Sequence, residues 1–144
     1  MARLERGDWA HLLPHAGGMC LLDAVEHWDA ATIHASSASH ARADHPLRGQ
    51  GGLHAVHLAE YGAQAMALHG ALLDRAAGCE AVRPGMLVSL RDVRIEVEWV
   101  EGAGGRLDVH AERIYGDVAG AQYVFRVERG AVVLVSGRVA VLFG

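Results

Sequence analysis

The chain has 144 residues, of which 13 are basic and 17 acidic, so its formal net charge is −4, and 51% of its residues are hydrophobic. This length and apolar content predict a single domain, residues 1–144, with a full hydrophobic core. Every basic residue is an arginine, which excludes a lysine Schiff base and a P-loop lysine. The acidic balance argues against nucleic-acid binding, which needs a basic face.

The cysteine content and the hydropathy pattern bear on where the protein works. Cys20 and Cys79 allow at most one disulfide and form no CxxC motif, which is typical of reduced thiols in the cytoplasm. No uninterrupted apolar stretch approaches the roughly 20 residues that span a bilayer. We therefore expect a soluble cytoplasmic protein that does not contact a membrane.

The first predicted elements are two strands and a long helix. The stretches Met19 to Trp28 and Ala31 to Ser37 are the candidate strands. The helix is expected from Gly52 to about Ala77, because this stretch is rich in alanine and leucine and contains no proline, and Gly78 would end it. Since nearly every position in it is small or apolar, the helix should be buried on most sides.

Beyond residue 85 the sequence alternates between apolar and polar residues, as strands do. Four strands are predicted, separated by turn-like stretches: Leu87 to Val100, Arg106 to Tyr115, Gln122 to Val127 and Val132 to Phe143. Short turns favour antiparallel pairing of consecutive strands in a meander. Strands that follow one long apolar helix predict an α+β domain whose sheet curls around that helix.

Three local motifs accompany this order of elements. They are LLPHAGGMCLLD at Leu12 to Asp23, EYGAQAMA at Glu60 to Ala67, and PGMLVSLRDVRI at Pro84 to Ile95. Together with the element order they resemble the 3-hydroxyacyl-acyl carrier protein dehydratases of the hotdog fold, and the third motif is similar to the aryl-polyene-type branch. The resemblance covers most of the chain. It implies a curled antiparallel sheet of five to six strands wrapped around one long central helix.

The resemblance also implies a reaction and two catalytic residues. Enzymes of this family remove water from a 3-hydroxyacyl thioester and form a trans-2-enoyl thioester. His45 would take the α-proton as the base, and Glu60 would protonate the leaving hydroxyl as the acid. The loop before the helix departs from the family's GHFPG motif and reads DHPLRGQGG from Asp44 to Gly52. His45 precedes Glu60 by fifteen residues where fourteen are expected, so the alignment needs one inserted residue.

Elementary chemistry supports these assignments. A base that works near neutral pH suits histidine, whose ordinary pKa is about 6.5. A carboxyl suits the role of the acid only if it stays protonated or is strongly hydrogen-bonded, and the apolar neighbours of Glu60 predict burial that would raise its pKa. Backbone N–H groups of Gly51 and Gly52, expected at the positive end of the helix dipole, would bind the thioester oxygen.

Other polar residues near Glu60 have alternative roles. His57 lies three residues before Glu60 on the same helix face, so it is a rival base or a partner of the carboxyl at the substrate site. Gln64, four residues after Glu60, should orient the carboxyl by a hydrogen bond or cap a neighbouring strand. His15 matches a structural position of the family. Although His54 and His57 share the helix, spacing fixes no complete ligand set, and we expect no metal and no cofactor.

The resemblance further implies an oligomer and a protein partner. Hotdog enzymes form homodimers or higher homo-oligomers whose helices meet across a continuous sheet, and the acyl chain lies in a tunnel at the interface. His45 of one subunit would then face Glu60 of the other. Because the acyl carrier protein is acidic, an arginine patch should lie near the tunnel mouth, and Arg48, Arg83 and Arg91 are the candidates.

Two other functions stay open at this point. Some hotdog enzymes are thioesterases in which a helix carboxylate activates water, a reaction that Glu60 alone could serve. The incomplete histidine loop also permits a non-catalytic hotdog subunit that stabilises an active partner.

Overall fold

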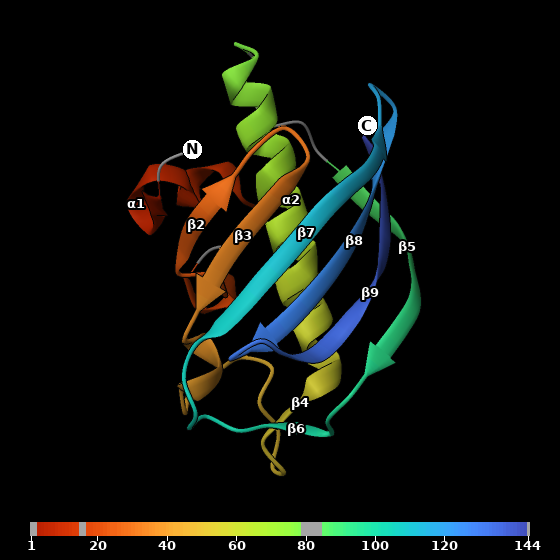
Figure 1. The fold of residues 1–144 in the computed structure, drawn as a ribbon. Coiled ribbons are helices and arrows are strands. Elements are labelled where there is room, and N and C mark those ends of the chain that lie inside the picture. Colours follow the sequence, from red (N-terminus) through yellow and green to blue (C-terminus); the bar gives the residue numbers. More distant parts are fainter. Residues whose placement is uncertain (1–2, 15–16, 79–84, 144) are drawn as a thin grey trace.

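One long helix lies across the face of a large antiparallel sheet (Figure 1). The computed structural model describes residues 3–14, 17–78 and 85–143. The central helix, α2, spans Leu58–Ala76 and packs against strands β3, β7, β8 and β9. The predicted α+β class and the hotdog arrangement of sheet and helix are confirmed. Within the described residues, no helix is long and apolar enough to cross a membrane.

The large sheet has seven strands in the order β1-β2-β3-β7-β8-β9-β5, and every neighbouring pair is antiparallel. The strands are β1 (Leu4–Glu5), β2 (Ala24–Trp28), β3 (Thr32–Ser37), β5 (Gly85–Ile95), β7 (Leu107–Gly116), β8 (Gly120–Arg129) and β9 (Val132–Phe143). The count exceeds the predicted five to six because the two-residue strand β1 adds to the edge of β2.

The predicted meander of four strands is only partly correct. Strands β7, β8 and β9 do pair in succession, but β5 pairs with β9 at the far edge of the sheet. Between β5 and β7 the chain forms β6 (Trp99–Val100), which pairs with β4 (Leu53–His54) in a separate two-stranded sheet. This pairing carries the chain past the start of α2, so that β7 can join β3 in the sheet interior (Figure 1).

Short helical turns complete the chain. They are α1 (Arg6–Trp9) and the 3-10 helices η1 (Ala10–Leu12), η2 (Gly17–Met19), η3 (Ser39–Ala41) and η4 (Ala55–His57). The first predicted strand therefore starts too early, because only Ala24–Trp28 pairs with β3. Residues 19–22 bond instead to side chains: Arg6 donates to the carbonyl of Leu22, and Gln64 bonds the backbone of Met19 and Leu21.

The predicted helix also begins too early, at Gly52 instead of Leu58. Tertiary contacts occupy the backbone that an earlier start would need. Leu53 pairs with Val100, and the N–H of Ala55 donates to the carbonyl of Glu98 at 2.8 Å. Such partners lie far away in the sequence, so local propensity does not reveal them. The predicted end is confirmed, since α2 stops at Ala76 and Gly78 has a φ of +88°.

A glycine allows α2 to lie close to the sheet. A Cβ atom at Gly62 would stand 2.4 Å from Cδ2 of Phe125 on β8, closer than side chains pack. On the same helix, a Cβ at Gly70 would meet no atom within 4 Å. The position of the helix therefore requires a residue without a side chain at position 62 but not at position 70.

We predict opposite effects of alanine at these two glycines. Gly62→Ala should destabilise the fold, because the overpacking cost of about 1–3 kcal/mol exceeds the gain in helix propensity. Gly70→Ala, the matched control, should raise the free energy of unfolding by about 0.5–1 kcal/mol. Urea denaturation followed by circular dichroism measures both, and equal stability of the two variants would contradict the close packing.

Candidate active site

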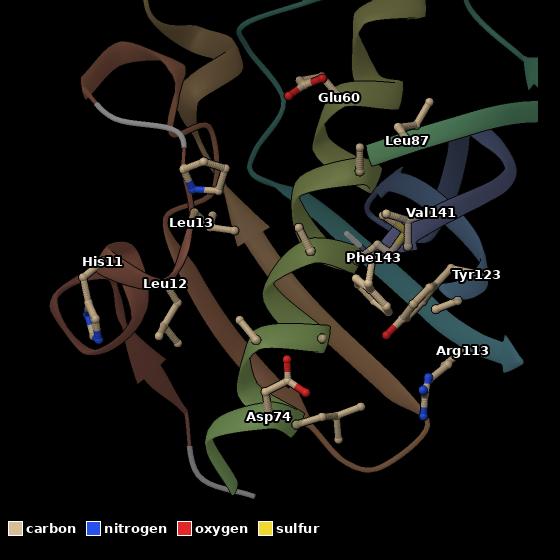
Figure 2. Close-up of a pocket in the computed structure, with 18 residues that line it drawn as sticks. His11, Leu12, Leu13, Glu60, Asp74, Leu87, Arg113, Tyr123, Val141 and Phe143 are labelled. Carbon is tan, nitrogen blue, oxygen red and sulfur yellow. The ribbon is translucent and has the colours of Figure 1, made fainter. Parts of the chain in front are cut away.

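A cavity of about 740 Å³ runs along one face of α2 (Figure 2). The helix contributes residues spaced three and four apart, which therefore share a face: Glu60, Ala63, Ala67, Gly70 and Asp74. Small side chains in the middle of this row leave the space open. The other walls are the segment from His11 to Pro14 and residues of β5, β7, β8 and β9. The arrangement is an apolar channel with a carboxyl group at each end of its helical wall.

Glu60 stands at one end of this channel and is held by a buried amide. The Nε2 group of Gln64 donates to Oε1 of Glu60 at 3.4 Å. The same amide donates to the carbonyl of Met19 at 2.7 Å and accepts from the N–H of Leu21 at 3.0 Å. These backbone partners fix which end of the Gln64 amide is nitrogen. Glu60 itself is only partly buried, in contrast to the expectation of a carboxyl enclosed by apolar residues.

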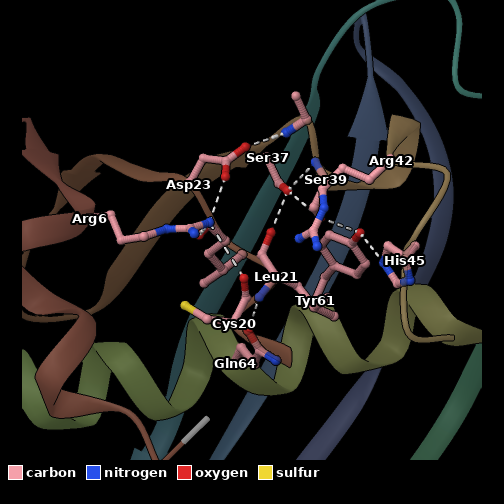
Figure 3. A network of polar contacts seen from close by, with 12 residues as sticks. Arg6, Cys20, Leu21, Asp23, Ser37, Ser39, Arg42, His45, Tyr61 and Gln64 are labelled. Carbon is pink, nitrogen blue, oxygen red and sulfur yellow. Dashed lines mark hydrogen bonds and ion pairs between the residues drawn. The ribbon is translucent and has the colours of Figure 1, made fainter. Parts of the chain in front are cut away.

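His45 lies inside its own chain. It is 3% exposed, its Nδ1 accepts from the N–H of Leu47 at 3.1 Å, and its Nε2 lies 3.0 Å from the hydroxyl of Tyr61 (Figure 3). Burial is the main cause that lowers the pKa of His45, and the nearby guanidinium groups of Arg48 and Arg42 lower it further. His45 is therefore neutral near pH 7, as a base must be. For Nδ1 to contact any other group, the Leu47 N–H would have to give up its acceptor.

The other predicted substrate-binding residues lie around the start of α2. His57 directly precedes the helix, one turn before Glu60, and is partly exposed. Gly51 and Gly52 are not at the helix start as expected, because they belong to a turn that precedes β4. The N–H of Gly52 donates to the carbonyl of Gly49 at 3.1 Å, so it is not available to a thioester.

Close packing against Trp99 explains the glycine at position 51. A Cβ atom there would stand 2.8 Å from the indole of Trp99 on β6. Trp99 is itself 45% exposed and makes an edge contact with the His54 ring. The glycine-rich turn therefore serves the contact between β4 and β6.

The two candidate arginines that the structure describes lie on different elements. Arg48 turns back into its own loop, where it donates to the carbonyls of Arg42 and His40 at 3.2 and 2.7 Å. Arg91 is exposed on the edge strand β5. Arg83 and the structural candidate His15 lie outside the described residues.

The structure adds a buried histidine beside the channel that the sequence analysis did not single out. His69 in the middle of α2 is fully buried, and its Nε2 donates to the carbonyl of Asp29 at 2.7 Å. Its Nδ1 therefore accepts from the hydroxyl of Tyr123, a residue that lines the channel. Burial lowers the pKa of His69 and raises that of Tyr123. The sequence does show a histidine within an apolar helix, which signals a buried polar group. Its two hydrogen-bond partners, however, are 40 and 54 residues away in the sequence.

The polar side chains of this site are suited to proton transfer. Within the described part of the chain, no three histidine, cysteine, aspartate or glutamate side chains are grouped to hold a metal ion. A carboxyl group at the end of an apolar channel can protonate a leaving group, and a neutral imidazole can accept a proton. Glu60 lines the channel but His45 does not, so the channel by itself does not bring the two groups together.

Known proteins share this sequence pattern and fold. A family model described as ApeP-like: ApeP dehydratase matches residues 7–143. A chain of the dehydratase heterocomplex ApeI:P from Xenorhabdus doucetiae is 25% identical, with a TM-score of 0.82 over 94% of this chain and 90% of that chain. No curated protein matches.

Two further structures are similar in fold. AziG from S. sahachiroi is 21% identical, with a TM-score of 0.61 over 92% of this chain and 97% of that chain. The thioesterase enzyme SAV0944 from Staphylococcus aureus is 14% identical, with a TM-score of 0.61 over 83% of this chain and 90% of that chain. At these identities the likeness concerns the fold alone.

We predict that the buried His69 makes the fold sensitive to acid. Its pKa is lowered in the folded state, so below about pH 6.5 the unfolded chain binds a proton that the folded chain does not. The free energy of unfolding should therefore fall as the pH drops from 7 to 5.5. In His69→Gln that fall should be smaller by about 1 kcal/mol.

Urea titrations at the two pH values measure this difference. His27→Gln, at an exposed position on β2, is the control and should keep the wild-type pH dependence. If His69→Gln also keeps it, the proton is taken up elsewhere.

Proposed function

The chain belongs to the ApeP-like dehydratase family, and we propose that it removes water from a 3-hydroxyacyl thioester carried by an acyl carrier protein. The product is a trans-2-enoyl thioester. The observation that supports this proposal most directly is Glu60 at the end of an apolar channel, with the Gln64 amide on its carboxyl. An acyl chain fits such a channel, and the carboxyl stands where a polar group of the chain would arrive.

The proposed reaction is an elimination in which atoms and charge balance. His45 takes the proton from the carbon next to the thioester carbonyl, and the electron pair of that C–H bond forms the new double bond. The C–O bond at carbon 3 breaks, and Glu60 gives its proton to the departing hydroxyl, so that water leaves. His57, one turn before Glu60, is the alternative base. Proton exchange with solvent restores both groups, and no redox partner is needed.

A partner chain is part of this proposal. The edge strand β5 exposes large apolar side chains between Leu87 and Ile95, each at least 36% exposed, which is uncommon for a strand of this length. A second hotdog chain that continues the sheet at this edge would cover them and close the channel wall that β5 forms with Leu87. The similar Xenorhabdus structure is a heterocomplex. We propose a second copy of this chain as the partner.

We predict that Glu60→Gln abolishes dehydration. General acid catalysis contributes about 10² to 10⁴ in rate, so kcat should fall at least 100-fold. The assay follows enoyl absorbance and free thiol together, with a 3-hydroxyacyl group on carrier protein. Glu112→Gln, an exposed carboxyl on β7, is the matched control and should keep full activity.

The same assay separates the competing functions. His45→Asn should lose dehydration like Glu60→Gln, whereas His27→Asn should not. Free thiol without enoyl product from the wild-type protein would contradict the dehydratase and indicate a thioesterase. No turnover at all, restored only when a second hotdog chain is added, would indicate a non-catalytic subunit.

We further predict that charge on the β5 edge separates the subunits. Val88→Asp combined with Leu90→Asp would place two carboxylates in the apolar contact, so the particle should shrink from twice the chain mass to the 15.3 kDa of a single chain. Light scattering after gel filtration measures the mass. Val118→Asp, on a turn where the side chain is 87% exposed, is the control. If the double variant stays dimeric, the two subunits do not meet at the β5 edge.

A further inference from the structure

A row of hydrogen bonds leads from His45 into the core (Figure 3). The His45 Nε2 lies 3.0 Å from the hydroxyl of Tyr61, which lies 2.6 Å from that of Ser39. The Ser39 hydroxyl lies 2.8 Å from that of Ser37, which donates to the carbonyl of Leu21. All four side chains are at most 3% exposed. Water therefore does not compete for these bonds.

The two ends of this row fix the direction of every bond. At one end, the Leu47 N–H donates to Nδ1 of His45, so Nδ1 carries no proton and a neutral ring carries it on Nε2. At the other end, a carbonyl can only accept, so the Ser37 hydroxyl donates to it. Ser39 must then donate to Ser37, and Tyr61 to Ser39. The oxygen of Tyr61 is left as the acceptor for the Nε2 proton of His45.

We infer that Tyr61 is a positioning residue that holds His45 as the Nε2–H tautomer and stabilises its protonated form, so that the substrate proton is received at Nδ1. The inference rests on the proposed dehydratase function. In the proton transfer, the C–H bond of the substrate breaks and the Nδ1–H bond forms, and the Leu47 N–H gives up its acceptor. The positive ring then keeps its Nε2–H bond to the phenol oxygen.

The surroundings explain why such an acceptor matters. The ionisable groups near His45 come from its loop, from η3 and from the start of α2, and they are Arg42, Arg48, Asp44, His40 and His57. The arginines oppose a second positive charge. Asp44 is exposed and bonded to Arg42 at 3.1 Å, so it offers His45 little. The Tyr61 oxygen is therefore the partner that supports the ring while it carries the proton, and the row behind it polarises that oxygen further.

Leu21, where the row of hydrogen bonds from His45 ends, is also connected to Glu60, the proposed acid. Leu21 accepts from Ser37 through its carbonyl and donates through its N–H to Gln64, whose amide reaches Glu60. The two arms share Leu21 but belong to different peptide groups, so the connection positions the two groups without passing charge between them. A change at Tyr61 should therefore affect His45 and leave Glu60 unchanged.

Tyr61→Phe tests the inference, because it removes only the hydroxyl. Hydrogen bonds to charged groups exceed neutral ones by about 1.4 kcal/mol, which corresponds to one pKa unit or a tenfold rate. We expect kcat to fall about tenfold with KM nearly unchanged, and the acidic limb of the pH profile to move down by about one unit. Ser39→Ala should act in the same direction if Tyr61→Phe folds poorly. Tyr115→Phe, 59% exposed on β7, is the matched control.

Nitrogen NMR of the His45 ring gives a readout that needs no turnover. The resting protein should show a protonated Nε2 and an unprotonated Nδ1, and Tyr61→Phe should titrate about one unit lower. A protonated Nδ1, or a His45 titration that Tyr61→Phe leaves in place, overturns the inference even if the enzyme dehydrates its substrate. Inactive wild-type protein with the expected NMR behaviour would overturn the proposed function and support the arrangement at Tyr61. If kcat falls but the acidic limb of the pH profile does not move, Tyr61 contributes only packing and the inference is wrong.

Discussion

Three polar side chains buried on α2 determine how the helix lies against the rest of the protein. Tyr61, Gln64 and His69 are each fully buried, and each finds its hydrogen-bond partners in a different part of the chain. Because an unpaired buried polar group costs about 1–3 kcal/mol, sliding or turning the helix would break several bonds together. Gly62 adds a steric condition at the same interface, since only hydrogen fits against Phe125.

The candidate site follows from this placement. With the polar side chains turned toward the sheet and the N-terminal segment, the row of small residues after Glu60 is left facing an open channel. The Gln64 amide belongs to both features, because it ties the backbone of Met19 and Leu21 to the helix and also reaches the Glu60 carboxyl. The bonds that hold the fold therefore also orient the group proposed as the acid.

The proposed base and the proposed acid differ in how they are held. His45 is enclosed by its own loop and by Tyr61, while Glu60 is partly open to the channel. A neutral imidazole and a carboxyl at one end of an apolar channel are the proton acceptor and the proton donor that the proposed elimination needs. The proposed partner chain at the exposed apolar edge of β5 would close the channel on the side that this chain alone leaves open.

The sequence by itself determined what depends on near neighbours. The alanine-rich run predicted the helix and its end at Gly78, alternation predicted the strands, and the four-residue spacing placed Gln64 beside Glu60. Only the tertiary structure decided the helix start, the position of β5 next to β9, and the direction in which His45 points. Each of these depends on partners far along the chain, such as Val100 for Leu53 and Tyr61 for His45. Local periodicity carries no information about such contacts, because they exist only once the backbone has folded.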